Sequence, residues 1–413
     1  MDRTQIAQWR GNSKTLSMDQ CIDGSTHLFI PVVNQDQFVF CQKCLMCVQL
    51  DTGTEPMPPE PPKPIPNPPD AVTYRPSGGD DTSAIQRMLD EYHAKPVMIS
   101  GMCKITNTLW FNGDNRVLCG DSGVKSGFLS SAPGPFSGHY GALLCVQSNK
   151  SAIRNLEFDG QNNPTEMVFF DGGSDNLIEL CYFHDINFRE GNAPYAAIHS
   201  QNCINLTVRG NTIERTKGRD GGEGVRGIWI PGVSGTLIES NTVRDTGHTG
   251  IAIEGNGGTI RNNVVEKSLT QGTGYKMMWR GSGQSGFVFT GNKTNETVGA
   301  GLMLEAMGNQ SLPITIDGNE FVNCGKQGTS FGAIYVSSTT RKIEFKNNKL
   351  NNCRTTGALI HVSESSFTEN SFESMNGVLN LESDCHKIDL TRSGSVNVGS
   401  NCNEITVDGV KVA

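Results

Sequence analysis

Charged side chains make up only 18% of the 413 residues, and aromatic side chains only 7%. No apolar run is long enough to span a bilayer, and the N-terminus from Met1 to Arg10 lacks the apolar core of an export signal. The net charge of −8 argues against general binding of nucleic acid. We therefore expect no membrane or nucleic-acid partner, no signal peptide, and assembly in the cytoplasm of the producing cell.

A short pattern recurs through the second half of the chain: an apolar residue, two variable residues, Asn, a variable residue and an apolar residue. An earlier copy has Cys181 in the Asn position. Successive Asn residues are 22 to 30 positions apart, a spacing that is typical of stacked structural repeats. The repeated residues are Asn211, Asn241, Asn263, Asn292, Asn319, Asn348 and Asn370.

This pattern predicts an all-β fold, a right-handed parallel β-helix with one coil per repeat. The residues around each Asn alternate between apolar and polar, as in strands, and Asn suits a corner where its amide can bond neighbouring backbone. An antiparallel β-sandwich is the alternative, but hairpins do not repeat one Asn corner at coil-length spacing. Cys324 and Cys353 each follow their Asn by five residues, so we expect a buried stack of thiols rather than a disulfide.

The β-helix is predicted to occupy residues 71–413 and to begin with a short helix. Asp81 or Thr82 would cap the helix, and Ile85, Met88 and Leu89 would line one face and cover the open end of the coil. The sequence Gly79-Asp80-Asp81-Thr82-Ser83-Ala84-Ile85, followed by short strands, resembles the beginning of β-helices in the pectate-lyase (pectin-lyase-like) superfamily, including phage tailspikes. The resemblance implies this fold and a carbohydrate context, but the reaction motifs of alginate epimerases and polygalacturonases are missing.

Residues 1–55 are predicted to form a small β-rich module that is joined to the β-helix by a Pro-rich linker, residues 56–70. Its strands would cover residues 27–33, 37–40 and 45–50. Cys41, Cys44 and Cys47 are spaced to bind zinc or an iron–sulfur cluster, with Cys21 or His27 as a fourth ligand. Free thiols on a small sheet are the alternative. No cofactor is expected for the β-helix.

A row of outward-facing residues is predicted on the strand that follows each Asn corner. Aromatic rings beside carboxylates and a guanidinium could bind the rings and hydroxyls of sugars. A second outward row would contain Glu254, Arg280 and Glu305, and long loops would form a wall near Trp229 that includes Arg226. The first row reads His199, Trp229, Ala252, Met278, Met303, Tyr335, His361 and Asn380. The candidate substrate-binding residues are the ring-bearing members of this row, His199, Trp229, Tyr335 and His361, together with Arg280.

Four residues are candidates for catalysis. Glu254 and Glu305 would lie two coils apart, which suits an acid and a base in inverting hydrolysis. A Glu–Arg–Glu ladder that merely stabilises the stack is the alternative. Asp245 and His248 could form a base and its orienting partner, although a surface pair is the simpler interpretation.

The layout of small module, stiff linker and long β-helix favours a phage tailspike or tail-fibre protein. Residues 1–55 would dock on other tail proteins, the β-helix would bind and could depolymerise host surface polysaccharide, and the virion protein could be a homotrimer. A bacterial polysaccharide lyase, hydrolase or epimerase and a non-enzymatic virion decoration are the alternatives.

Overall fold

The computed structural model describes residues 6–8, 29–32, 35–41, 47–50 and 65–413, the last range with short gaps. The gaps are residues 133–140, 164–165, 188–195, 218–223, 270–271, 280–285, 306–311, 326–331, 337–339, 355–356, 361, 374–377 and 392–394. The chain forms two compact units, Met1–Lys63 and Pro64–Ala413. None of the described helices is long and apolar enough to cross a membrane.

The first unit contains a four-stranded antiparallel sheet in the order β1-β4-β3-β2. Its strands are β1 (Ile6–Gln8), β2 (Phe29–Val32), β3 (Gln35–Cys41) and β4 (Cys47–Leu50). The strands predicted over residues 27–33, 37–40 and 45–50 are thereby confirmed. Cys41 ends β3 and Cys47 begins β4, whereas Cys21 and Cys44 lie outside the described residues, so the metal site stays a prediction.

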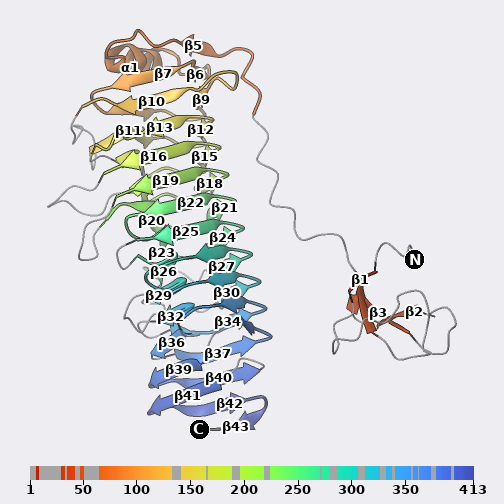
Figure 1. Ribbon diagram of the computed structural model, residues 1–413. Coiled ribbons are helices and arrows are strands. Elements are labelled where there is room, and N and C mark those ends of the chain that lie inside the picture. The colour runs from red at the N-terminus through yellow and green to blue at the C-terminus, as the bar shows by residue number, and fades with distance from the viewer. Residues whose placement is uncertain are drawn as a thin grey trace. The chain divides into compact units, whose positions relative to one another are not determined.

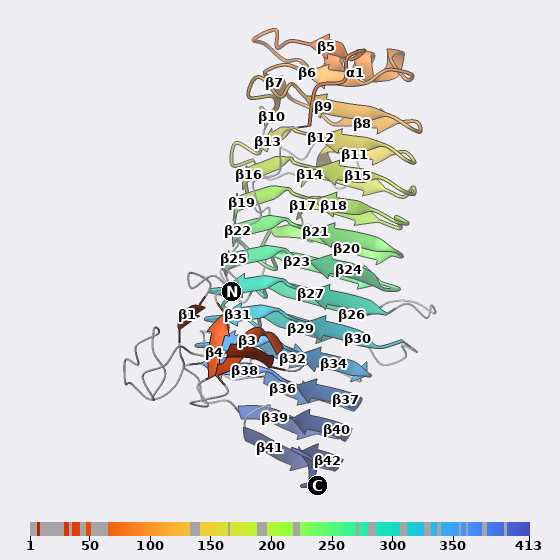
Figure 2. The same ribbon diagram turned by 90° about the vertical axis from the view of Figure 1, so that its right-hand side faces the viewer.

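The second unit is a coil of three parallel sheets, which Figures 1 and 2 show stacked rung upon rung. The 16-stranded sheet contains β5 (Val72–Tyr74), β6 (Val97–Ile99), β9 (Val117–Gly120), β12 (Ala152–Arg154), β15 (Leu177–Glu179), β18 (Thr207–Arg209), β21 (Thr236–Glu239), β24 (Gly258–Arg261), β27 (Phe287–Thr290), β30 (Ile314–Asp317), β33 (Thr340–Arg341), β34 (Ile343–Lys346), β37 (Val362–Thr368), β40 (His386–Thr391), β42 (Asn403–Val407) and β43 (Val410–Lys411). The 11-stranded sheet contains β7 (Met102–Ile105), β10 (Gly127–Ser130), β13 (Glu157–Asp159), β16 (Tyr182–Ile186), β19 (Thr212–Thr216), β22 (Thr242–Thr246), β25 (Val264–Ser268), β28 (Lys293–Asn295), β31 (Glu320–Val322), β35 (Lys349–Asn351) and β38 (Ser371–Glu373). The 12-stranded sheet contains β8 (Leu109–Asn112), β11 (Ala142–Gln147), β14 (Glu166–Asp171), β17 (Ala196–Gln201), β20 (Arg226–Val233), β23 (Ile251–Gly255), β26 (Tyr275–Trp279), β29 (Leu302–Glu305), β32 (Ile334–Val336), β36 (Gly357–Ile360), β39 (Val378–Ser383) and β41 (Ser395–Ser400).

The seven repeated Asn residues all lie between the 16-stranded and the 11-stranded sheets, and all are buried. Asn263 Nδ2 donates to Asn292 Oδ1 at 3.0 Å, and Asn263 Oδ1 accepts from the side chain and the backbone N–H of Asn241. The same bonds run without interruption from Asn211 to Asn370. The ladder excludes the antiparallel sandwich for this unit, because its strands pair in parallel from one coil to the next.

The residue directly before each corner Asn has a positive φ. Such a left-handed residue turns the chain sharply at the end of a strand, and glycine adopts it without a steric cost. This explains why glycine recurs beside the corner, at Gly210, Gly291 and Gly318. The eight residues, which include the one before Cys181, are Leu180, Gly210, Ser240, Asn262, Gly291, Gly318, Asn347 and Glu369.

Helix α1 (Thr82–Glu91) covers the first coil, as predicted, with Ile85 and Leu89 fully buried (Figure 1). The capping bond differs from the expectation. Asp81 stands at the cap position, but its carboxylate accepts from Tyr74 Oη at 2.7 Å and from the backbone N–H groups of Ser77 and Lys104. Asp80 Oδ1 instead accepts from the backbone N–H of Thr82 at 3.0 Å. The Asp81 carboxylate therefore links the first strands of the coil, β5 and β7, by hydrogen bonds.

Residues at the end of the Pro-rich segment are bound to the coil. Asn67 Nδ2 donates to Asp121 Oδ1 at 2.8 Å, Asn67 Oδ1 accepts from the backbone N–H of Ser122, and Asn155 Nδ2 donates to the carbonyl of Ile65. The coil unit thus begins before residue 71, where the sequence analysis placed its start.

Cys324 and Cys353 are both buried thiols without a disulfide, as predicted from their equal distance to the corner. They continue an inner column of small polar residues at the end of successive strands of the 11-stranded sheet. The column reads Thr216, Thr246, Ser268, Thr297, Cys324 and Cys353. Burial raises the pKa of the Cys324 thiol well above its usual value, so Cys324 stays protonated at neutral pH.

We predict that Asn263→Ala destabilises the β-helix by about 2–4 kcal/mol. The substitution removes the amide and leaves the buried side chain and backbone N–H of Asn241 and the carbonyl of Ile238 without that partner. Asn397→Ala is the control, because Asn397 makes an Asn–Asn bond at the exposed surface. Urea unfolding followed by circular dichroism measures both variants, and equal midpoints would contradict the importance of the buried ladder.

Candidate functional site

The first outward row of the 12-stranded sheet is confirmed in part. Trp229 pairs with His199 on one side and Ala252 on the other, and Met303 pairs with Tyr335. Two positions were wrong. The full row reads Trp110, Cys145, Phe169, His199, Trp229, Ala252, Lys276, Met303, Tyr335, Ala358, Asn380 and Asn397.

Lys276 stands where Met278 was predicted, because the strand is shifted by two residues. The alternation of apolar residues fits either register. The structure places Tyr275 inward because its hydroxyl donates to the carbonyls of Asn263, at 2.9 Å, and Lys293, at 3.1 Å. Ala358 likewise replaces His361, which lies outside the described residues.

The centre of the row is a platform that consists of His199, Arg226, Trp229 and Glu254. The imidazole of His199 stacks on the indole of Trp229, with ring centroids 4.3 Å apart. Trp229 Nε1 donates to Glu254 Oε1 at 3.0 Å, and the guanidinium carbon of Arg226 lies 4.9 Å from the centroid of the Trp229 ring. Arg226 was expected near Trp229, and the structure confirms this. The indole is therefore held by the His199 ring on one face, by the nearby guanidinium of Arg226 and by Glu254 at its edge.

His199 supports the platform from the inside rather than offering its own face to a ligand. Its exposed fraction is only 2%, and its Nδ1 lies 2.9 Å from Oε1 of Glu166, which is completely buried. Phe169 packs edge-on against the other side of the imidazole. This corrects the expectation that His199 contacts a substrate, because the neighbouring rings enclose it. Glu166 was not predicted, because the predicted row begins only at His199.

Burial shifts the pKa of Arg226 in the platform and of Glu166 beneath it. Complete burial raises the pKa of Glu166 well above its usual value, against the opposing effects of a backbone hydrogen bond from Ala196 and of Arg226. Burial also lowers the pKa of Arg226 to about 10, although Glu254 and Glu166 act to raise it. Arg226 is therefore still a cation at neutral pH, and its buried Nη1 has no hydrogen-bond partner among the described residues.

The predicted Glu–Arg–Glu row is corrected. Glu254 pairs in register with Met278, and Met278 with Glu305, so that an apolar side chain lies between the carboxylates. Glu305 Oε2 instead lies 2.5 Å from the ammonium of Lys276. Arg280 lies outside the described residues. The two carboxylates remain two coils apart, as expected.

Asp245 and His248 lie at the end of β22 and just beyond it, on the 11-stranded sheet and its following turn. Asp245 has a positive φ of 49°, and Nδ1 of His248 lies 2.9 Å from the hydroxyl of Thr249. They thus belong to a different sheet from the platform.

A coil of three parallel sheets with an internal Asn ladder and an outward aromatic platform defines a parallel β-helix protein. The family model for the right-handed beta helix region matches residues 135–282 and 226–411. The chain belongs to this family, and the predicted right-handed fold and the likeness to pectin-lyase-like β-helices are confirmed. No curated protein sequence matches the chain.

Several solved structures share the fold at low sequence identity. The A-module of mannuronan C-5 epimerase AlgE6 from Azotobacter vinelandii is 15% identical, with a TM-score of 0.53 over 80% of this chain and 95% of that module. The Streptococcus pneumoniae surface protein and adhesin PfbA is 11% identical, with a TM-score of 0.52 over 82% of this chain and 97% of the adhesin. The catalytic domain of a GH87 alpha-1,3-glucanase variant with tetrasaccharides is 15% identical, with a TM-score of 0.50 over 88% of this chain and 69% of that domain.

We predict that Glu166→Gln stabilises the protein at neutral pH. The wild-type carboxyl binds its proton more tightly when folded than when unfolded, so its contribution to stability is present below about pH 4.3 and is lost as the pH rises. The advantage of the variant should grow by about 1.4 kcal/mol per pH unit until the folded-state pKa is passed. Urea unfolding between pH 4 and pH 8 measures this difference.

Glu179→Gln is the matched control for this prediction. Glu179 is also buried, but its carboxylate forms ion pairs with Arg154 and Arg209. Its neutralisation should therefore destabilise the protein at neutral pH. A Glu166→Gln variant that is less stable than wild type at pH 8 would contradict the assignment of Glu166 as a neutral acid.

Proposed function

We propose that the outer face of the 12-stranded sheet binds a glycan around Trp229, and that the chain is a phage tailspike or tail-fibre protein that attaches to host surface polysaccharide. The observation that carries the proposal is the half-buried indole of Trp229, which is held flat by His199 and bonded to Glu254. A rigid aromatic ring beside charged groups suits a ligand that has both apolar ring faces and hydroxyl groups.

The chemistry of sugars fits each part of the platform. The C–H groups of a sugar ring pack on an aromatic face, while carboxylates and guanidinium groups bond its hydroxyls. Because His199 and Arg226 already fix the orientation of the indole, a bound sugar would not have to order it. Tyr335 lies four rungs further along the same row, which would allow an extended chain to follow the stack.

The names of proteins with the same fold support a carbohydrate ligand. One is a glucanase solved with tetrasaccharides, one a mannuronan epimerase and one a surface adhesin. The role in a virion is supported by the separate first unit and by the proline-rich segment that follows it. Residues 1–55 would dock on other tail proteins, and a homotrimer would match the assembly of such fibres.

We predict that Trp229→Ala weakens binding of host surface polysaccharide by about 0.5–1.5 kcal/mol, or roughly 2- to 12-fold. The loss follows from removal of the ring on which the sugar stacks. Trp110→Ala is the control, since Trp110 lies in the same outward row four rungs before Trp229. Binding to purified capsule or lipopolysaccharide measures both, and an equal effect of the two substitutions would place the ligand elsewhere.

Hydrolysis of the bound glycan is a second candidate function. Glu254 and Glu305 are separated by two coils, so their backbones lie about 9–10 Å apart. Carboxyl groups about 6.5–9.5 Å apart leave room for the water that attacks in an inverting reaction. Glu305, whose carboxylate pairs with the ammonium of Lys276, would be the base and Glu254 the acid.

We predict that Glu254→Gln and Glu305→Gln each abolish any shortening of the glycan while binding is largely kept. Each substitution keeps the shape of the side chain and removes its charge. Size-exclusion chromatography of the polysaccharide after incubation measures the cleavage. Wild-type protein that binds the glycan but never shortens it would show a receptor-binding protein without this activity.

We predict that a chain beginning at Pro64 folds and binds glycan but is not incorporated into particles. The reason is that the coil and its cap are complete from this residue onward, while the docking unit is removed. Assembly assays with tail particles, with the full chain as the control, measure the incorporation. Normal incorporation of the shortened chain would contradict the docking role of residues 1–55.

A further inference from the structure

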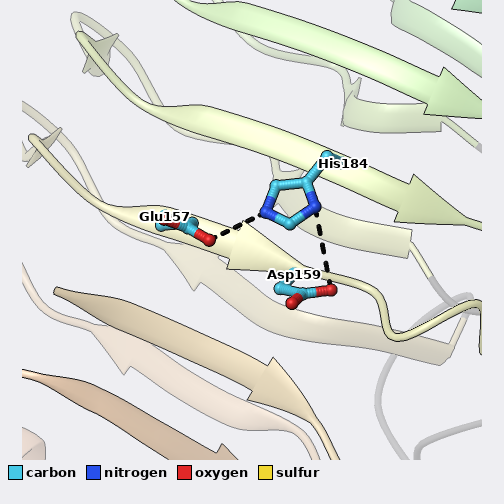
Figure 3. Close-up of side chains that lie close together, drawn as sticks. All are labelled: Glu157, Asp159 and His184. Atoms are coloured by element: carbon cyan, nitrogen blue, oxygen red, sulfur yellow. Dashed lines mark hydrogen bonds and ion pairs between the residues drawn. The ribbon is translucent and has the colours of Figure 1, made fainter. Parts of the chain in front are cut away.

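A second cluster of titratable residues lies on the 11-stranded sheet, apart from the platform. Figure 3 shows Glu157 and Asp159 on β13 below the imidazole of His184 on β16. The register pairs Asp159 directly with His184. The side chains of Glu157, Asp159 and His184 are only 10%, 13% and 7% exposed. Together with Asp185 they are called the His184 cluster below.

Both ring nitrogens of His184 face carboxylate oxygens. Nε2 lies 2.8 Å from Glu157 Oε1, and Nδ1 lies 2.7 Å from Asp185 Oδ2 and 3.8 Å from Asp159 Oδ1. A neutral imidazole has one N–H, so it can donate to only one of these sides. On the other side its lone pair would meet carboxylates, which is favourable only when a proton or a metal ion lies between them.

The partners of Glu157 indicate which nitrogen carries the hydrogen. Glu157 Oε1 also lies 2.7 Å from the ammonium of Lys125, so this carboxylate is already neutralised and is suited to accept the Nε2–H. A carboxylate that holds one ring nitrogen of a histidine in this way is the usual support of a metal-binding imidazole. The lone pair of Nδ1 is then directed towards Asp159 and Asp185.

The charges around the ring leave room for a divalent cation. The carboxylates outnumber the cations by four to two, which gives a net charge of −2 with a neutral ring. A proton on His184 would neutralise half of this charge, whereas a divalent ion would neutralise all of it. The carboxylates are Glu157, Asp159, Asp185 and Glu214, and the cations are Lys125 and Arg215.

The backbone of Asp185 turns its carboxylate towards Nδ1 of His184. Asp185 has a positive φ of 55°, and its two oxygens accept from Nε and Nη2 of Arg215 at 2.9 and 3.2 Å. The same left-handed position recurs in the following coils, at Arg215, Asp245 and Lys267, so the bend itself belongs to the fold. The cluster is specific to this coil because the preceding residue is His184.

We propose that His184 Nδ1, Asp159 and Asp185 bind a divalent transition-metal ion such as Zn²⁺ or Mn²⁺, with Glu157 orienting the imidazole. A nitrogen ligand beside two carboxylates suits these ions better than Ca²⁺ or Mg²⁺, which prefer oxygen ligands only. The bound ion would join neighbouring rungs of the 11-stranded sheet. It lies on a different sheet from Trp229, so it does not depend on the proposed glycan site.

The test uses the full chain with Cys41, Cys44 and Cys47 replaced by Ser, so that those thiolates do not contribute. After chelation, calorimetric titration with Zn²⁺ and with Mn²⁺ should show one site per chain, and the melting temperature should rise with the ion. Asp159→Asn should weaken binding at least tenfold, and Glu157→Gln should weaken it by about 10- to 100-fold.

Glu266→Gln is the matched control, because Glu266 lies in the same outward row but pairs with Arg244 beyond the cluster. Its affinity for the ion should equal that of the parent. Circular dichroism of each apo variant verifies the fold. Absence of a stoichiometric site in the folded parent, or equal binding by Asp159→Asn, would overturn the proposal.

Discussion

The buried Asn ladder is the interaction on which the rest of the structure depends. Each corner amide from Asn211 to Asn348 donates to the next coil and to a backbone carbonyl of the preceding one, as Asn241 does with Asn263 and Val208. A coil that shifted by one residue would leave these buried groups without partners, at a cost of about 1–3 kcal/mol each. The ladder therefore sets the register of the strands on both sides of the corner, and through it the spacing of every outward row.

Register has a direct electrostatic consequence. Residues at equivalent positions of neighbouring coils lie about 4.8 Å apart, so like charges in one row repel unless opposite charges alternate with them. The rows of charged residues follow this rule. Glu179 lies between Arg154 and Arg209, and Arg244 pairs with Glu266. Glu239 and Arg261 form a further pair of this kind.

Two places depart from this simple alternation, and they are the platform and the His184 cluster. At the platform, Glu166 is buried beside an imidazole, and its neutral form is favoured. At the His184 cluster, carboxylates lie on both sides of one ring. Natural proteins accept such local conflicts mainly at functional sites, where a ligand resolves them. The two places lie on different sheets and can therefore act independently.

The sequence predicted the coil, but not the register at Lys276, the role of Asp81 or the involvement of Glu166. The alternating pattern around Lys276 allows either Lys276 or Met278 to stand in the first outward row. The hydrogen bonds of the buried Tyr275 hydroxyl to two backbone carbonyls favour Lys276. Asp81 was predicted to cap helix α1. Its carboxylate instead accepts hydrogen bonds from Tyr74 Oη and from the backbone N–H of Lys104. Trp229 and Glu254 were recognised, whereas Glu166 lies outside the repeats that were aligned.

By itself, the sequence determined the repeated coil, the Asn corner, the thiol stack and the helix that covers the first coil. These depend on local alternation and on one residue per repeat, which are visible along the chain. Only the tertiary structure decided other contacts across coils: Lys276 beside Glu305, and Glu157 and Asp159 around His184. The loops between strands differ in length, so residues about 25 to 30 positions apart become neighbours only when the ladder brings the coils into register.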